Sequence, residues 1–165
     1  MTISSTVRIA GPYTGTGTSA TFGFGFKIFS SSDLLVVQLD VATGVQTTLM
    51  LTTDYTVTLN ANQDNNPGGN VILNAGNLAV GQTLTITTNV ANLQPTDLTN
   101  QGGFYPEVIT DSLDRATIQI QQISQATQGA LTAPISDGSI NMTIPTVAAR
   151  AGKFLSFDTN GLPTV

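Results

Sequence analysis

The segment from Pro106 to Gln128 constrains the fold most, because its apolar residues follow a helical repeat of seven. Apolar or small residues recur there in alternating steps of four and three: Ile109, Leu113, Ala116, Ile120, Ile123 and Thr127. This spacing defines a heptad seam along one side of an α-helix. Pro106 suits the first helical turn, and Gly129 marks the end. The sequence therefore predicts one long helix over residues 106–128.

A helix of this length with one apolar seam is not stable alone in water, so the seam must be buried. Packing on the rest of its own chain is one possibility, because short seams are common in globular helices. Association between copies is favoured, because the seam is narrow and follows seven residues rather than the period of about 3.6. Isoleucine at both kinds of core position, as in Ile120 and Ile123, favours three or more strands. The six seam residues are therefore the predicted interface of a trimeric parallel coiled coil.

The chain before the helix consists of short segments with β-strand patterns, separated by turns. In Thr21–Phe29 and Asp54–Leu59, large apolar residues alternate with small or polar ones, as in strands with one buried face. Short strands at regular spacing predict a β-sandwich or a small barrel. The expected core residues of this domain are Phe22, Phe24, Phe26, Ile28, Tyr55, Val57, Leu84 and Ile86.

These patterns predict a mainly β chain with a sandwich-like N-terminal domain, one long helix and an extended or hairpin tail. The expected segments are a β domain (1–92), a linker (93–105), the helix (106–128) and a C-terminal segment (129–165). In the last segment, Ser139–Pro145 alternates like a short strand, and Asp158–Gly161 is typical of a hairpin turn. This segment has too little apolar surface to fold independently, so we expect it to pair with neighbouring chains or another protein.

The residue inventory argues against most enzyme classes. The chain has no His and no Cys, which excludes His-based general bases, Ser-His-Asp and Cys-His catalysis, and thiolate or imidazole metal sites. Five basic residues are scattered among ten acidic ones, which argues against a nucleic-acid partner. No apolar run approaches the roughly 20 residues of a membrane-spanning helix. We therefore expect no catalysis, cofactor, metal, nucleic-acid partner or membrane.

Several smaller motifs receive structural interpretations. Asp111 and Asp114 share a helix face and are interpreted as a solvated helix start, and Asp64 lies in a loop whose ligand spacing fails for calcium. The glycines of Gly11–Gly17 precede no Lys-Ser/Thr pair and no helix, so they predict a flexible turn rather than a phosphate loop.

An ordered series of short motifs resembles a known family. The series runs through Phe24–Phe29, Asp33–Val36, Leu51–Val57, Gly68–Leu73, Gly81–Ile86, Gln94–Leu98, Gly102–Glu107 and Leu113–Arg115. Over roughly residues 1–128, this order resembles the N-terminal domain of T7-like podophage tail fibres and tailspikes. The segments Arg150–Lys153 and Asp158–Gly161 resemble what often follows this domain in phage fibres and spikes.

The resemblance implies a structural anchor that attaches a trimeric receptor-binding protein to the virion tail. It implies a homotrimer that is made in the bacterial cytoplasm and docks on tail tube, adaptor and nozzle proteins near the portal. A second receptor-binding protein is a further possible partner. The family usually continues into a shaft and a tip, whereas this chain ends at Val165. A truncated chain, the ordered base of a longer fibre, and a short adaptor that holds a separate spike or depolymerase all stay open.

Two other functions remain as alternatives. A carbohydrate-binding β module would need an exposed aromatic platform, and the chain offers no Trp and only Tyr13, Tyr55 and Tyr105 as tyrosines. A polysaccharide depolymerase would need paired carboxylates in a cleft.

Overall fold

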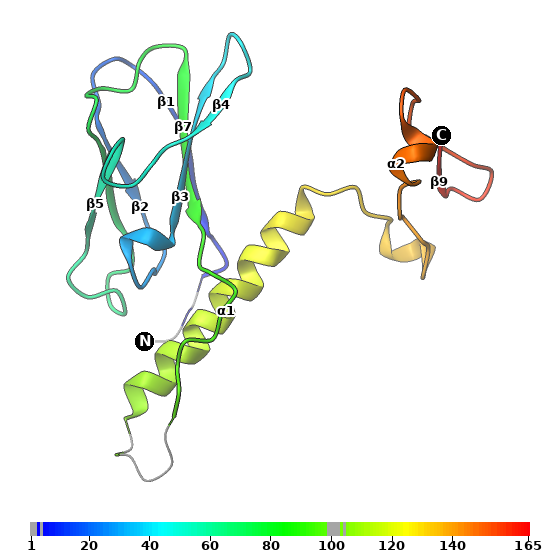
Figure 1. The fold of residues 1–165 in the computed structure, drawn as a ribbon. Helices are drawn as coiled ribbons and strands as arrows, with labels where there is room; N and C mark the ends of the chain where they lie inside the picture. Colours follow the sequence, from blue (N-terminus) through cyan, green and yellow to red (C-terminus); the bar gives the residue numbers. More distant parts are fainter. Residues whose placement is uncertain (1–2, 4, 99–102, 104) are drawn as a thin grey trace. The chain divides into compact units, whose positions relative to one another are not determined.

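The computed structural model describes residues 3, 5–98, 103 and 105–165. The chain divides into two compact units, residues 1–125 and residues 126–165 (Figure 1). It is mainly β, with antiparallel sheets and one long helix, which confirms that part of the predicted fold class. The trimeric coiled coil remains a prediction. Within the described residues, no helix is both long enough and apolar enough to cross a membrane.

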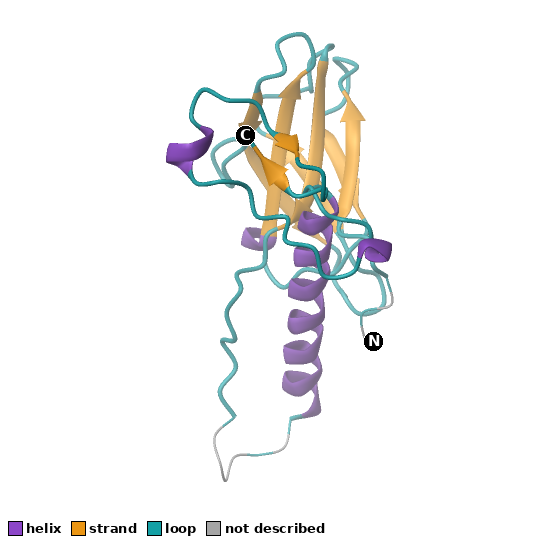
Figure 2. Ribbon diagram, turned by 90° about the vertical axis from the view of Figure 1, so that its right-hand side faces the viewer, coloured by secondary structure: helices purple, strands orange, loops and turns teal. Residues whose placement is uncertain are grey.

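The first unit contains two antiparallel sheets, whose strands run roughly alongside one another in Figure 2. The four-stranded sheet has the order β1 (Ile9–Thr14), β7 (Gln82–Thr88), β3 (Leu34–Asp40) and β4 (Gln46–Thr48). The three-stranded sheet has the order β2 (Thr21–Phe24), β6 (Gly69–Leu73) and β5 (Tyr55–Leu59). Strands β3 and β7 form the centre of the larger sheet, and they pair without a break from Leu34 opposite Thr88 to Asp40 opposite Gln82.

Both sheets contribute to a single apolar core. Seven of the expected core residues are buried, namely Phe22, Phe24, Phe26, Ile28, Tyr55, Leu84 and Ile86. Val57 is partly buried and packs against this cluster. The core also contains Leu34, Val36, Val71 and Leu78, which lie in or beside strands of both sheets. Alternation therefore placed the expected strand residues, such as Phe22 and Leu84, on the correct face. Phe26 and Ile28 are buried as well, although they lie beyond the end of β2.

Three segments differ from the expectations drawn from sequence. The flexible turn expected at Gly11–Gly17 is wrong for its first part, because Ile9–Thr14 forms β1 and its Ala10 and Tyr13 pack against the core. The register of β1 against β7 shifts between those two residues, which hides the strand from a simple period of two. The strand expected at Thr21–Phe29 ends at Phe24, and Ser139–Pro145 forms no strand.

Helix α1 (Pro106–Gln128) follows the β domain and lies beside the segment that leads into it (Figure 1). Gln119 Nε2 donates to the backbone oxygens of Ala91 and Leu93, at 2.7 and 3.0 Å. Ser112 Oγ hydrogen-bonds Thr96 Oγ1 at 2.9 Å. The segment after β7 and the helix are thus connected along their length. Residues 99–102 and 104 of the predicted linker lie outside the described residues.

The second unit contains short elements only. These are the 3-10 turn η2 (Ile135–Asp137), the one-turn helix α2 (Val147–Arg150) and a hairpin of β8 (Ser156–Phe157) and β9 (Pro163–Thr164). The Asp158 carboxylate accepts hydrogen bonds from the backbone N–H groups of Asn160 and Leu162, which closes the hairpin turn.

Candidate functional site

Helix α1 contacts its own β domain through the side that carries Asp114 and Ile118. Ile118 is 0% exposed and Asp114 is 3% exposed, and these are the buried residues of the described helix. The carboxylate of Asp114 accepts from the backbone N–H of Ile3 at 3.3 Å, so the N-terminal segment also lies against this face. We call the surface around Asp114 and Ile118 the docked face.

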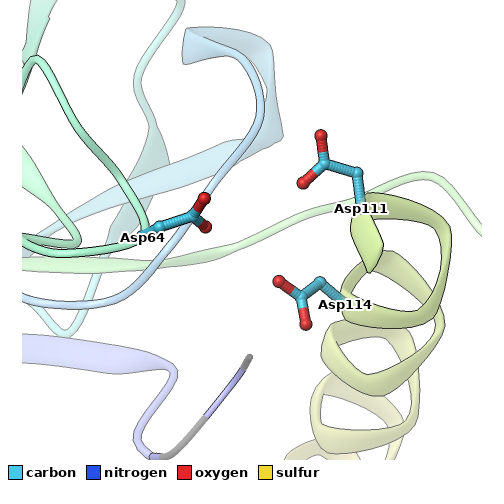
Figure 3. Close-up of side chains that lie close together, drawn as sticks. All are labelled: Asp64, Asp111 and Asp114. Carbon is cyan, nitrogen blue, oxygen red and sulfur yellow. The ribbon is translucent and has the colours of Figure 1, made fainter. Parts of the chain in front are cut away.

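Three carboxylates surround the ammonium group of Lys27 at the docked face, and we call these four side chains the Lys27 cluster. Lys27 Nζ lies 2.6 Å from Asp64 Oδ1, 3.1 Å from Asp111 Oδ1 and 2.9 Å from Asp114 Oδ2. The three carboxylates point toward one another from the loop after β5 and from α1 (Figure 3). Burial alone would lower the pKa of Lys27, but the hydrogen bonds to Asp64, Asp114 and Asp111 outweigh it and raise the pKa. The ammonium group therefore stays charged and joins the helix to the β domain.

Local hydrogen bonds in turns position two members of this cluster, Asp64 and Lys27. The Asn62 side-chain oxygen accepts from the backbone N–H groups of Asp64 and Asn65, which fixes the loop that carries Asp64. On the other side, the 3-10 turn η1 (Ser31–Asp33) is closed by Asp33, whose carboxylate accepts from the backbone N–H groups of Phe29 and Ser30. This turn ends the irregular segment that contains Lys27.

The loop that carries Asp64 depends on one glycine. Gly68 has a φ of +103°, and a Cβ atom at this position would lie 2.0 Å from the backbone oxygen of Phe24. The left-handed backbone and the close approach both require glycine here. The backbone of Gly68 is also held by Gln63, whose amide donates to its oxygen at 2.7 Å and accepts from its N–H at 2.9 Å.

The set of Asp64, Asp111 and Asp114 has the composition of a cation site, since its ligand oxygens lie within 4.8 Å of one another. The Lys27 ammonium group bonds to an oxygen of each of the three carboxylates. It supplies the positive charge that a metal ion would otherwise bring. The residues present therefore fit an ion-pair network that connects three segments of the chain.

Two arginines extend the network along the helix. Arg8 is 2% exposed, and its guanidinium donates to Gln121 Oε1 at 2.6 Å and to the backbone oxygens of Ser5 and Lys27. Burial lowers the pKa of Arg8, and the nearby charge of Asp114 partly offsets this effect. Arg115 lies over the ring of Phe29, with 4.8 Å between its guanidinium carbon and the ring centroid. Such stacking of a cation on an aromatic ring is attractive.

Further along the helix, glutamine side chains continue the contact. Gln122 accepts from the backbone N–H of Val90 at 2.9 Å and donates to the backbone oxygen of Val90 at 3.2 Å. Val90 is 1% exposed, just beyond the end of β7. The contacts of the docked face are therefore mostly hydrogen bonds and ion pairs of polar side chains, and Ile118 is its buried apolar residue.

The predicted trimer seam lies on the opposite side of the helix and is largely uncovered. Leu113 is 64% exposed, Ile120 is 68% exposed and Ile123 is 52% exposed. Ala116 and Thr127 are also exposed, and Ile109 is partly buried. At about 100° per residue, the six seam residues lie about 140° to 220° around the helix axis from Ile118. The helix therefore packs on its own β domain without using the seam.

Sequence reasoning missed the Lys27 cluster. The interpretation of Asp111 and Asp114 as a solvated helix start is wrong for Asp114, which is buried against Lys27. The basic residues appear scattered along the sequence, yet Arg8, Lys27 and Arg115 all lie at the docked face. One signal was available, because Lys27 stands between the apolar residues Phe26 and Ile28 in a chain with few charges. A buried lysine requires an acidic partner.

The three tyrosines occupy different environments. Tyr55 is 2% exposed in the core, Tyr13 is partly buried against Phe22, and Tyr105 is 67% exposed. A carbohydrate platform that combines all three therefore receives no support from the fold.

Comparison with known proteins connects the chain to phage tails. Over 134 residues, or 81% of the chain, it is 38% identical to the tail spike protein of Salmonella phage epsilon15. The chain spans only 12% of the length of that relative. No protein-family model matches the chain. The similarity supports a relationship to phage tail spikes and tail fibres, which is coarser than the T7-like N-terminal domain expected from the motifs.

Proposed function

We propose that the chain is a structural anchor that attaches a trimeric receptor-binding protein to a phage virion tail. Three copies join through the seam residues Ile109, Leu113, Ala116, Ile120, Ile123 and Thr127, and each helix keeps its own β domain on the opposite side. The relationship to a tail spike protein supports a role in the phage tail. The observation that carries the trimer is the uncovered apolar seam, about 180° from the docked face.

The arrangement suits an anchor because each helix connects two different surfaces. The β domain is attached to one side of α1 by the Lys27 cluster and by Gln122, so that it follows the helix as the helix associates. Burial of the seam is worth about 25 cal/mol for each Å² of apolar surface. Association through the seam would therefore hold three β domains around one axis without any disulfide bond.

In this proposal, the β domains dock on tail tube, adaptor and nozzle proteins, and a receptor-binding or degrading part is held at the other end. The N-terminal domain of T7-like tail fibres and tailspikes remains the specific relative that we propose. The anchor itself performs no catalysis in this proposal. Turnover of capsule polysaccharide by this chain alone would contradict that part of the proposal.

Leu113→Asp tests the trimer directly. An aspartate at this position would place three like charges at the axis, so we expect light scattering to show monomers instead of trimers. Gln128→Asp is the matched control, because it adds the same charge to the same helix at an exposed position outside the seam and away from the Lys27 cluster. A trimer that survives Leu113→Asp would show that the assigned seam is wrong.

A further inference from the structure

The second unit has an apolar cavity that the described chain leaves open. The cavity has a volume of about 420 Å³ and is lined mainly by Leu131, Pro134, Ile140, Met142 and Phe157, with Asp137 as its acidic side chain. Pockets of roughly 300–1,000 Å³ accommodate small organic molecules, so one aromatic side chain fits within this volume.

The same unit presents an aromatic side chain that nothing in the described chain covers. Phe154 is 94% exposed and does not line the cavity of its own chain. It lies between α2 and β8, next to Lys153 in the sequence. Exposure of a phenyl ring to this degree is unfavourable, because burial of such a ring is worth about 1.5–3 kcal/mol.

Charge favours contact between copies of this unit. Residues 126–165 contain two acidic residues, Asp137 and Asp158, and two basic residues, Arg150 and Lys153. The unit is therefore formally neutral, and the net charge of −5 belongs to the first unit. Copies of the second unit can approach closely without net repulsion. A phenyl ring with a lysine beside it also matches an apolar cavity with an aspartate in its lining.

We propose that Phe154 of one copy occupies the cavity of a neighbouring copy, where Lys153 pairs with Asp137. A contact of this kind uses two different surfaces, so it closes into a ring when three copies are related by a threefold axis. Each cavity is then filled by Phe154 of the neighbouring copy. The inference rests on the proposed trimer, and it adds a second interface beyond the helix seam.

Chain connectivity supports a second copy as the occupant. Helix α1 ends at Gln128, and Leu131 of the cavity follows three residues later. Three residues span at most about 11 Å. A trimer formed through the seam would therefore keep the Leu131 residues of the three copies near one another, whatever the orientation of each second unit.

Phe154→Trp tests the inference in the full chain, because the chain has no other tryptophan. We expect the variant to remain trimeric by light scattering, with emission at the short wavelength of a buried indole and weak quenching by acrylamide. Adding Leu113→Asp should separate the copies and expose the indole. Met50→Trp is the matched control, since Met50 is 65% exposed on the β domain and its indole should stay accessible to quencher.

Because indole is larger than phenyl, a second measurement keeps Phe154 in place. Unlabelled and ¹⁵N-labelled chains are mixed through unfolding and refolding and then treated with a zero-length carbodiimide cross-linker. We expect mass spectrometry to find Asp137 joined to Lys153 in peptides of mixed isotope composition. Lys153→Asp should abolish this product, and Asp137→Lys with Lys153→Asp should restore a cross-link between the two positions.

The outcomes separate this inference from the proposed function. A trimer in which the indole of Phe154→Trp is accessible and no mixed cross-link forms would overturn the second interface and leave the seam intact. A monomeric wild-type chain would overturn the proposed trimer and the inference with it. A cross-link found only within single-isotope peptides would show that Lys153 pairs with Asp137 of its own copy, which also overturns the inference.

Discussion

Helix α1 reverses the usual arrangement of a surface helix, because its more polar side faces the β domain and its apolar side is exposed. The docked face contacts the β domain through Asp114, Gln121 and Gln122, with Ile118 as its buried apolar residue. The opposite side carries the apolar seam and is largely exposed in a single chain. A helix that only needed to cover its own domain would bury the apolar side instead.

The difference indicates a division of roles between the two sides. Hydrogen bonds and ion pairs at the docked face require particular partners at particular distances, so they fix the orientation of the helix on the β domain. Apolar contacts are less directional and scale with buried area. The seam is therefore suited to association between copies, while the docked face determines how each β domain is held relative to the shared axis.

Among the variants that test this difference, Lys27→Met should lower the free energy of unfolding the most. Without the ammonium group, the buried carboxylate of Asp114 loses its closest cation, and loss of one partner of a buried pair costs about 3–5 kcal/mol. The free energy of unfolding should be measured by urea denaturation in the monomeric Leu113→Asp background, because the stability of a trimer depends on concentration.

The double variant Lys27→Met with Asp114→Leu is the control for this prediction. Apolar residues often replace a buried ion pair without loss of stability, so we expect the double variant to recover most of the loss. If the double variant were as unstable as the single one, the uncompensated carboxylate would not be the cause.

Ile118→Ala and Ile120→Ala form a matched pair on opposite sides of the helix. Ile118 is 0% exposed, so its truncation should cost about 2–4 kcal/mol in the monomeric background. Ile120 is 68% exposed, so the same change should cost less than about 0.5 kcal/mol there. Urea denaturation of both variants measures the difference.

In the trimeric chain, without Leu113→Asp, we expect Ile120→Ala to have a clear effect. Its truncation should weaken association, which analytical ultracentrifugation would detect as dissociation at higher protein concentration. Equal effects of the two alanine variants in the monomeric background would show that the seam also contacts the β domain.

Arg115→Gln should have a smaller effect. The guanidinium lies over the ring of Phe29 and is only partly buried, so its loss should cost about 0.5–1 kcal/mol. Urea denaturation in the monomeric background would measure the change. Arg115→Lys should retain part of the attraction, and an equal loss in both variants would show that the contact does not depend on positive charge.

The sequence predicted the β core better than it predicted the helix contacts. Alternation identifies residues such as Phe22 and Leu84, because a strand with one buried face requires a period of two. The heptad likewise identifies Leu113 and Ile120 as one side of a helix. Both patterns arise from neighbours along the chain, so they are visible in a single sequence.

The Lys27 cluster could not be located in the same way. Lys27 and Asp114 are separated by 87 positions, and no local repeat connects them. Their proximity depends on how the helix lies on the two sheets, which a single sequence does not specify. The docked face was missed for the same reason, since its polar residues have no apolar period and resemble a solvated surface.

Asp64→Asn is expected to have the smallest effect, and it appears as a change in acid sensitivity. The hydrogen bond from Lys27, followed by the lysine charge, holds the pKa of Asp64 below its ordinary value of 3.8. Because the pKa is lower in the folded state, this carboxylate stabilises the fold above the ordinary value, and the contribution is lost as pH falls through the folded-state pKa. Urea denaturation from pH 5 downward should therefore show a shallower loss of stability in Asp64→Asn, below about pH 4.

Asp40→Asn is the control that shows whether the acid sensitivity depends on Lys27. The pKa of Asp40 is also lowered, chiefly by the backbone N–H of Thr43 within the β3–β4 turn, where Lys27 is not a partner. In a Lys27→Met background, Asp64→Asn should change the acid dependence of stability much less, because Lys27 is the main cause of the lowered pKa. Asp40→Asn should still flatten it to the same extent. If Asp64→Asn kept its full effect without Lys27, the lowered pKa of Asp64 would come from its own loop. Asp111 and Asp114 would then be the carboxylates that pair with Lys27 in a way that affects stability.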